Sequence, residues 1–114
     1  MWPELSQARI LIRPGVTDMR KQINGLSVMV QNNMAQGPFS GDLFLFCGRD
    51  KNLIKALYWD RNGFCLWSKR LEKGRFPWPE GAQRALELKP GELAMILDGI
   101  DFRKKFQPLA FERV

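Results

Sequence analysis

The sequence predicts an α+β domain, in which an antiparallel meander sheet of four or five strands carries one main amphipathic helix and a short C-terminal helix. Three observations lead to this fold class. Three apolar runs follow one another between Leu43 and Leu71, joined by short polar connections. Apolar residues recur at spacings of three and four over Asp18–Asn33, and a proline and a glycine bracket a second helical pattern over Pro90–Asp98.

The meander is the most strongly patterned part of the chain. Its runs, Leu43–Cys47, Leu53–Trp59 and Phe64–Leu71, are rich in residues that suit a pleated, half-buried surface. The connections Gly48–Asn52 and Asp60–Gly63 are too short for a crossover, so neighbouring strands run antiparallel. Neither of the last two runs separates into a polar and an apolar face. Either both faces are covered within the monomer, or one face meets a partner.

The segment before the meander predicts a strand and then the main helix. Ala8–Arg13 alternates in the manner of a short strand, which Pro14-Gly15 ends. Thr17 suits the N-cap of a helix, and Asp18 suits the positive end of the helix dipole. The helix predicted over Asp18–Asn33 has one apolar stripe, made of Met19, Ile23, Leu26, Val30 and Met34.

After the meander, Lys73–Pro79 is a basic and aromatic arm whose two prolines exclude a paired central strand. Arg84–Leu88 predicts another short strand. Pro90 suits the first turn of the C-terminal helix, and Gly99 suits its end. We expect a single domain over residues 1–114, with a core at about 8–102 and a tail at 103–114.

Size and composition narrow the class of protein. With 114 residues and 45% hydrophobic residues, the chain is long enough for one core. Its apolar runs are shorter than the roughly 18 residues of a membrane span, and the N-terminus lacks a signal-peptide pattern, so we expect a cytoplasmic protein with no membrane partner. Cys47 and Cys65 match no metal-ligand spacing and are expected to be reduced and to pack as small hydrophobes.

The net charge of +6 is unevenly distributed. Residues 42–79 hold eight basic and four acidic side chains, and residues 1–41 hold four and two. Residues 80–114 hold six of each and add nothing to the excess. This concentration of positive charge indicates a polyanionic partner.

The sequence shows no catalytic arrangement. An acyl-transfer triad would lack histidine, and there is no phosphate-binding glycine motif. Carboxylates such as those of Asp18, Asp60, Asp98 and Asp101 can bind Mg²⁺, but each has a simpler place at a helix end or in a turn. We therefore predict no catalytic residue, no metal site and no cofactor.

Basic and aromatic residues interleave along the meander and its exit. Lysine and arginine bind phosphates, and exposed nucleotides stack on aromatic rings. For the aromatic residues on the strands, we favour the simpler interpretation that they pack in the core. The residues predicted to bind nucleic acid are Arg20, Lys21, Arg49, Lys69, Arg70, Lys73 and Arg75, and those predicted to dock a partner are Phe76 and Trp78, of which Trp78 also suits base stacking.

The same segments resemble a known family. They are GVTDMRK at Gly15–Lys21, Gly25-Leu26, FSGDLFLFCGR at Phe39–Arg49, LYWDRNGFCLWSKRLEKGRFPWP at Leu57–Pro79 and LDGID at Leu97–Asp101. Together they are similar to TnpB, the accessory protein encoded by the second open reading frame of insertion sequences of the IS-sixty-six type. This family is unrelated to the RNA-guided nuclease that shares its label.

The resemblance extends from about Arg13 to Phe102, with small departures at Gln22–Asn24 and Ser68. It implies a helper in DNA transposition that acts beside a separately encoded transposase, and it carries over no catalytic residue. Our leading hypothesis is a non-catalytic protein that binds DNA, at the ends of the element, through the basic surface. The alternative is an adaptor that docks the transposase or a second copy, as a homo-oligomer, without direct contact with DNA. An independent nuclease is the least favoured reading.

Overall fold

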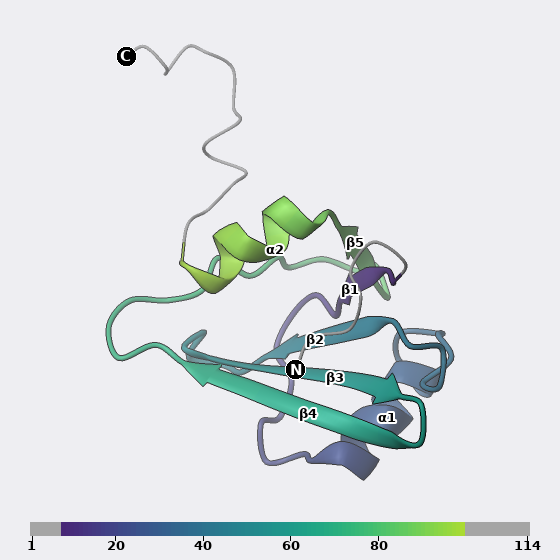
Figure 1. The fold of residues 1–114 in the computed structure, drawn as a ribbon. Coiled ribbons are helices and arrows are strands. Elements are labelled where there is room, and N and C mark those ends of the chain that lie inside the picture. Colours follow the sequence, from purple (N-terminus) through teal and green to yellow (C-terminus); the bar gives the residue numbers. More distant parts are fainter. Residues whose placement is uncertain (1–7, 100–114) are drawn as a thin grey trace.

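The computed structural model describes residues 8–99, which form one five-stranded sheet with two helices (Figure 1). The predicted α+β class is confirmed. No helix within the described range is long and apolar enough to cross a membrane. In chain order the elements are β1 (Ile10–Ile12), α1 (Ile23–Asn32), β2 (Leu43–Cys47), β3 (Leu53–Asp60), β4 (Gly63–Arg70), β5 (Leu86–Leu88) and α2 (Pro90–Leu97).

The sheet is mixed, and the expectation that it is antiparallel throughout is wrong. Its strand order is β4-β3-β2-β1-β5. The predicted antiparallel meander is confirmed for β2, β3 and β4, and β5 also pairs antiparallel with β1. However, β1 lies parallel to β2, with Ile10 opposite Leu43. The chain between these two strands crosses over through α1, and a connection of that length permits parallel neighbours.

An ion pair between the half-exposed Arg9 and the buried Asp42 secures the start of the parallel strands. Asp42, which is 7% exposed, accepts hydrogen bonds from the backbone N–H of Arg9 and from its Nη2, both at 2.9 Å. The hydroxyl of Ser40 donates a further bond at 2.9 Å. Burial acts to raise the pKa of Asp42, but these hydrogen bonds outweigh it and hold the pKa below its ordinary value. The ionised carboxylate therefore ties the start of β2 to the chain that leads into β1.

Helix α1 begins at Ile23, five residues later than predicted, and Thr17 is not its N-cap. Residues 18–21 form a turn, in which the Lys21 N–H donates to the carbonyl of Asp18 at 3.1 Å, and Gln22 is the N-cap. The apolar stripe is confirmed over the helix itself, since its core-facing members are buried. They are Leu26, Val30 and, just beyond the helix, Met34.

The late start of α1 has a cause that the sequence conceals. Lys55 of β3 is only 7% exposed, and its Nζ donates to the carbonyls of Met19 at 2.8 Å and of Lys21 at 2.9 Å. A helix through these residues would direct the same carbonyls along its axis to N–H groups one turn later. The buried ammonium group therefore favours a turn over a helix at this place.

Both faces of the sheet are covered at β3, whose central residues are buried, whereas the side chains of β4 are at most half-buried. Helix α1 covers one face, and α2 covers the other together with the chain after β4 (Figure 1). The core under α1 includes Leu11, Phe44, Phe46 and Leu57, and the core on the other face includes Ile12, Ile54, Ala56, Tyr58, Phe76 and Trp78.

The chain after β4 follows the sequence prediction closely. Residues 71–85 form no strand, as the prolines of the arm require. The short strand expected within Arg84–Leu88 is β5, and α2 begins at Pro90 as predicted. Gly99 follows α2 with φ 81°, the left-handed conformation that glycine adopts readily at a helix end. Residues of the predicted tail lie outside the described range.

Candidate nucleic-acid interface

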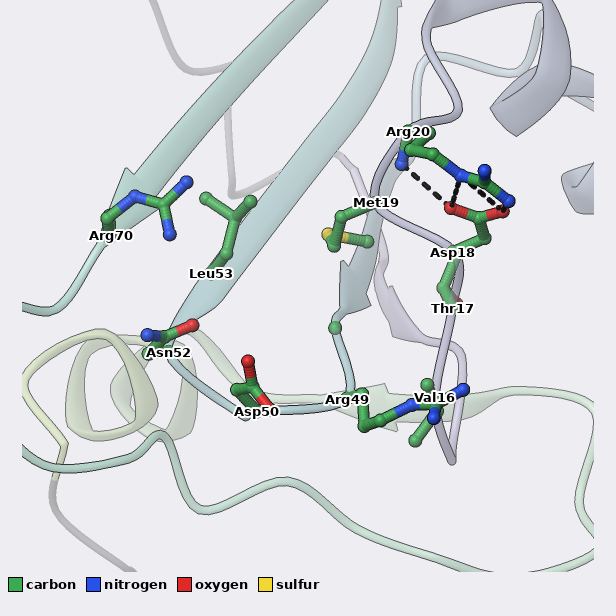
Figure 2. A pocket seen from close by; sticks show the side chains of 11 residues that line it. Val16, Thr17, Asp18, Met19, Arg20, Arg49, Asp50, Asn52, Leu53 and Arg70 are labelled. Carbon is green, nitrogen blue, oxygen red and sulfur yellow. Dashed lines mark hydrogen bonds and ion pairs between the residues drawn. The ribbon is translucent and has the colours of Figure 1, made fainter.

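An open groove lies where the chain before α1 meets the β2–β3 connection and the end of β4 (Figure 2). Its volume is about 790 Å³. Residues 16–20 form one side of it, Arg70 lies on the opposite side, and Arg49 and Asp50 come from the β2–β3 connection between them. The groove thus brings together three of the seven residues predicted to bind nucleic acid, namely Arg20, Arg49 and Arg70.

The three arginines differ in how their charge is balanced. Arg49 and Arg70 are exposed, and within residues 8–99 neither makes a hydrogen bond or an ion pair through its side chain. The Arg20 side chain is 91% exposed but forks onto Asp18, with Nε–Oδ1 at 3.0 Å and Nη2–Oδ2 at 2.8 Å. Arg49 and Arg70 are therefore the cations most available to an anion in the groove, and Arg20 is a partly neutralised third.

The Asp18–Arg20 pair keeps its charges over the ordinary pH range. Hydrogen bonds from the side chain and the backbone N–H of Arg20 hold the pKa of Asp18 well below its usual value. In turn, the hydrogen bond to Asp18 raises the pKa of Arg20. The pair fixes the direction of the Arg20 guanidinium at the rim of the groove.

The wall formed by residues 16–20 is fixed to the sheet at several points. The N–H of Thr17 donates to the carbonyl of Cys47 at 2.8 Å, and Lys55 holds the carbonyl of Met19. Gly48 permits the close approach, because a Cβ at this position would lie 2.6 Å from Cγ of Met19. Thr17 is 2% exposed, and its hydroxyl has no hydrogen-bond partner among the described residues. This wall is therefore held directly against the sheet.

Lys55 is a residue that sequence reasoning did not assign to the site. It does not line the groove, but it positions the turn that carries Asp18 and Arg20. The sequence does contain an indication of this role: Lys55 lies on the same face of its strand as Leu53 and Leu57, between apolar neighbours. A lysine at such a position must satisfy its ammonium group inside the protein.

The other four predicted cations lie outside the groove. The Nζ of Lys69 donates to the carbonyl of Leu97 at 2.8 Å, at the C-terminal end of α2 on the opposite face, where the helix dipole favours a cation. The side chain of Lys21 packs against Gly25. Lys73 and Arg75 are exposed on the arm. Lys69 therefore has a structural partner, whereas the nucleic-acid contact of all four stays a prediction.

The two residues predicted to dock a partner are buried. Phe76 is 2% exposed and Trp78 is 4% exposed. The Trp78 Nε1–H donates to the carbonyl of Arg13 at 3.0 Å, so the polar atom of the ring is also satisfied. A docking or stacking role requires an accessible ring, and in this structure both rings serve the core instead.

The accessible aromatic residues lie elsewhere. Phe39, which is 63% exposed, contacts Trp59 and Phe64 with ring centroids 5.0 and 5.3 Å away. Trp59 and Phe64 face each other across the β3–β4 hairpin, at 5.0 Å. This aromatic cluster lies at the turn end of the hairpin, and the groove lies at its other end, where Leu53 pairs with Arg70.

The structure supplies few groups for other chemistry. Within the described residues, no three histidine, cysteine or carboxylate side chains gather in a way that could hold a metal ion. Both cysteines are free thiols, and burial raises the pKa of Cys47 to about 11. Burial likewise raises the pKa of Tyr58 to about 12. Cys47 and Tyr58 are therefore neutral at physiological pH, and both are buried in the core.

Comparison with known proteins identifies the family. A family model described as IS66 Orf2 like protein matches residues 8–107. The uncharacterized protein y4hO of Sinorhizobium fredii (strain NBRC 101917 / NGR234) is 40% identical over 103 residues, which cover 90% of each chain. The uncharacterized protein y4jC of the same strain is 32% identical over 102 residues, covering 89% of this chain and 87% of that protein. No solved structure shows significant similarity. The chain therefore belongs to the IS66 Orf2-like (TnpB) family, the accessory proteins of transposition in insertion sequences of that type.

Proposed function

We propose that the protein assists a separately encoded transposase by binding element DNA through the groove of Arg20, Arg49 and Arg70. The observation that carries the proposal is the convergence of these three arginines from three separate segments onto one groove. Arg49 and Arg70 have no anionic partner within the described residues, so their guanidinium groups are available to phosphate oxygens. The excess positive charge of the chain adds long-range attraction.

The fold suits a contact with the DNA backbone more than the reading of bases. The groove lies among loops and a strand end, and it offers neither a helix nor a β-ribbon to insert into the major groove. Phosphate contacts position a protein without selecting a sequence. The protein would accordingly bind DNA with little sequence preference and leave the choice of site to the transposase.

A titration of the full chain with fluorescent duplex DNA tests the proposal. Affinity should fall as salt rises, because each neutralised phosphate releases counterions. Arg49→Ala and Arg70→Ala should each weaken binding and reduce the slope of log K against log salt by about 1. Arg61→Ala is the control, since it removes another exposed arginine, at the opposite end of the β3–β4 hairpin.

Two results would overturn the proposal. One is the absence of duplex binding at about 50 mM salt, where phosphate contacts are strong. The other is an equal loss of affinity in Arg61→Ala and Arg49→Ala, which would mean that only net charge matters.

The alternative function, an adaptor for the transposase, is favoured by the exposed ring of Phe39 in the aromatic cluster. Exposed aromatic residues at a convex edge are frequent anchors of protein interfaces. Phe39→Ala should then abolish co-purification with the transposase while the DNA titration stays unchanged. Arg49→Ala should have the converse effect if the groove binds DNA.

A further inference from the structure

β4 is one of the two outer strands of the sheet, and its outer edge is unpaired among the described residues. It pairs with β3 over eight residues, from Gly63 to Arg70, and no other strand of the described chain lies beside it (Figure 1). The pairing register is continuous, and β4 contains neither a proline nor a bulge. Native proteins normally protect a long, regular edge with charges, prolines or bulges, because its free N–H and C=O groups can pair with another strand.

The register identifies which backbone groups of β4 point outward. The N–H of Leu71 donates to the carbonyl of Asn52 at 2.8 Å, in the same register that pairs Leu53 with Arg70. In an antiparallel ladder, hydrogen-bonded and non-hydrogen-bonded pairs alternate. Residues of odd number on β4 therefore bond to β3, and the outward N–H and C=O groups belong to Phe64, Leu66, Ser68 and Arg70.

The middle of this edge lacks the usual protection. Residues 63–68 carry no charge, and the side chains of Phe64, Cys65, Leu66 and Trp67 are only half-buried within the monomer. The first charges, Lys69 and Arg70, stand at the end of the strand, and Lys69 is turned toward α2. A regular edge strand whose first six residues are uncharged and mostly apolar is suited to pair with a second strand.

We propose that β4 pairs antiparallel with β4 of a second copy of the chain, which joins the two sheets into one. This interface goes beyond the proposed binding of DNA, and it is tested without DNA because Arg70 belongs both to the groove and to the end of β4. Charge placement favours a second copy as the occupant. In full antiparallel overlap, Phe64 of one copy lies opposite Arg70 of the other, and the two Arg70 residues are six positions, or roughly 20 Å, apart. That distance exceeds the screening length of about 8 Å at physiological ionic strength, so like charges do not oppose the pairing of the neutral centres.

Sedimentation velocity over a range of protein concentrations, in high salt and without DNA, tests this interface. The wild-type chain should pass reversibly from monomer to dimer as its concentration rises. Ser68→Pro should stay monomeric, because it removes an outward N–H while the bonds between β4 and β3 remain. Ser68→Ala keeps the N–H and should dimerise like the wild type. Because proline also restricts the backbone of the strand, Ser68→Lys provides a second block: it places a charge on the neutral edge at an exposed position.

Amide hydrogen exchange gives an independent readout of the same pairing. In the dimer, the N–H groups of Phe64, Leu66 and Ser68 should gain protection as concentration rises, whereas those of Cys65 and Trp67 are already protected by β3. The proposal is overturned if the wild type stays monomeric at every concentration, or if folded Ser68→Pro and Ser68→Lys both dimerise. It is equally overturned if the wild type is monomeric and Ser68→Pro no longer co-purifies with the transposase. That result would mean that the edge of β4 pairs with a strand of the transposase.

Discussion

The turn that precedes α1, at residues 16–22, and the arm at residues 73–79 both carry cations beside apolar side chains. Both segments also lie against the β2–β3 connection. The turn is attached through Lys55 and through the bond from Thr17 to Cys47, and it leaves Arg20 in solvent. The arm is attached through rings that are buried, and through the bond from the Phe76 N–H to the carbonyl of Lys51 at 2.6 Å.

The difference shows that attachment, and not composition, decides which residues remain available for function. In the arm, Phe76 and Trp78 are used to fill the core, and Lys73 and Arg75 are exposed outside the groove of Arg20, Arg49 and Arg70. In the turn, the attachment uses backbone carbonyls and a buried lysine of another strand, so the side chains of Asp18 and Arg20 remain at the groove. Substitutions at the two attachments should therefore have different consequences.

Trp78→Ala should have the largest effect on stability. Removal of a buried tryptophan costs about 3–5 kcal/mol in the free energy of unfolding, from lost burial and the cavity left behind. The bond from Nε1 to the carbonyl of Arg13 is lost as well. Urea denaturation measures the change, with Lys73→Ala in the same arm as the control, at less than about 0.5 kcal/mol. Similar small losses in both variants would show that the arm does not belong to the core.

Lys55→Met should have the next largest effect, and it should reach the groove. The carbonyls of Met19 and Lys21 lose their donor, which costs about 2 kcal/mol in the free energy of unfolding. A turn that is no longer bonded to the sheet should also position Arg20 less well. The affinity of the folded variant for duplex DNA should therefore fall, beyond any loss caused by unfolded protein. Titration of the folded variant with DNA measures this.

Lys51→Met is the matched control for that experiment. It removes a lysine whose Nζ forms an ion pair with Glu80 at the surface, 2.8 Å away, and such pairs contribute at most about 1 kcal/mol. If Lys51→Met and Lys55→Met weaken DNA binding equally, the turn has no special part in the groove. The contrast between turn and arm would then be one of stability alone.

The same contrast explains how far the sequence predicts this molecule. Local pattern was sufficient for the meander and for α2, where short connections, Pro90 and Gly99 act on near neighbours. It was insufficient for the start of α1, because Lys55 acts on carbonyls 34 and 36 positions away along the chain. The parallel pairing of β1 with β2 is equally non-local.

The candidate site shows the same limit. Composition identified Arg20, Arg49 and Arg70 as cations, but only the topology shows that they share a groove. Composition could not separate them from Lys69, whose ammonium group is used at the end of α2. It also assigned an accessible aromatic role to Trp78, which is buried, whereas among residues 8–99 the ring of Phe39 is exposed.

Asp18→Asn should have the smallest effect and is the most specific test of the turn. Because the pKa of Asp18 is held well below its ordinary value, mild acidification leaves the carboxylate charged and does not release Arg20. The amide removes that charge at constant pH, and duplex affinity should rise by roughly threefold as Arg20 becomes available to phosphate. Asp50→Asn removes another carboxylate of the groove and controls for the general change in charge. A larger gain in affinity in Asp18→Asn than in Asp50→Asn would establish Arg20 as a phosphate ligand. Weaker binding in Asp18→Asn would instead mean that the carboxylate serves to orient the Arg20 guanidinium. The turn would then contribute geometry more than charge.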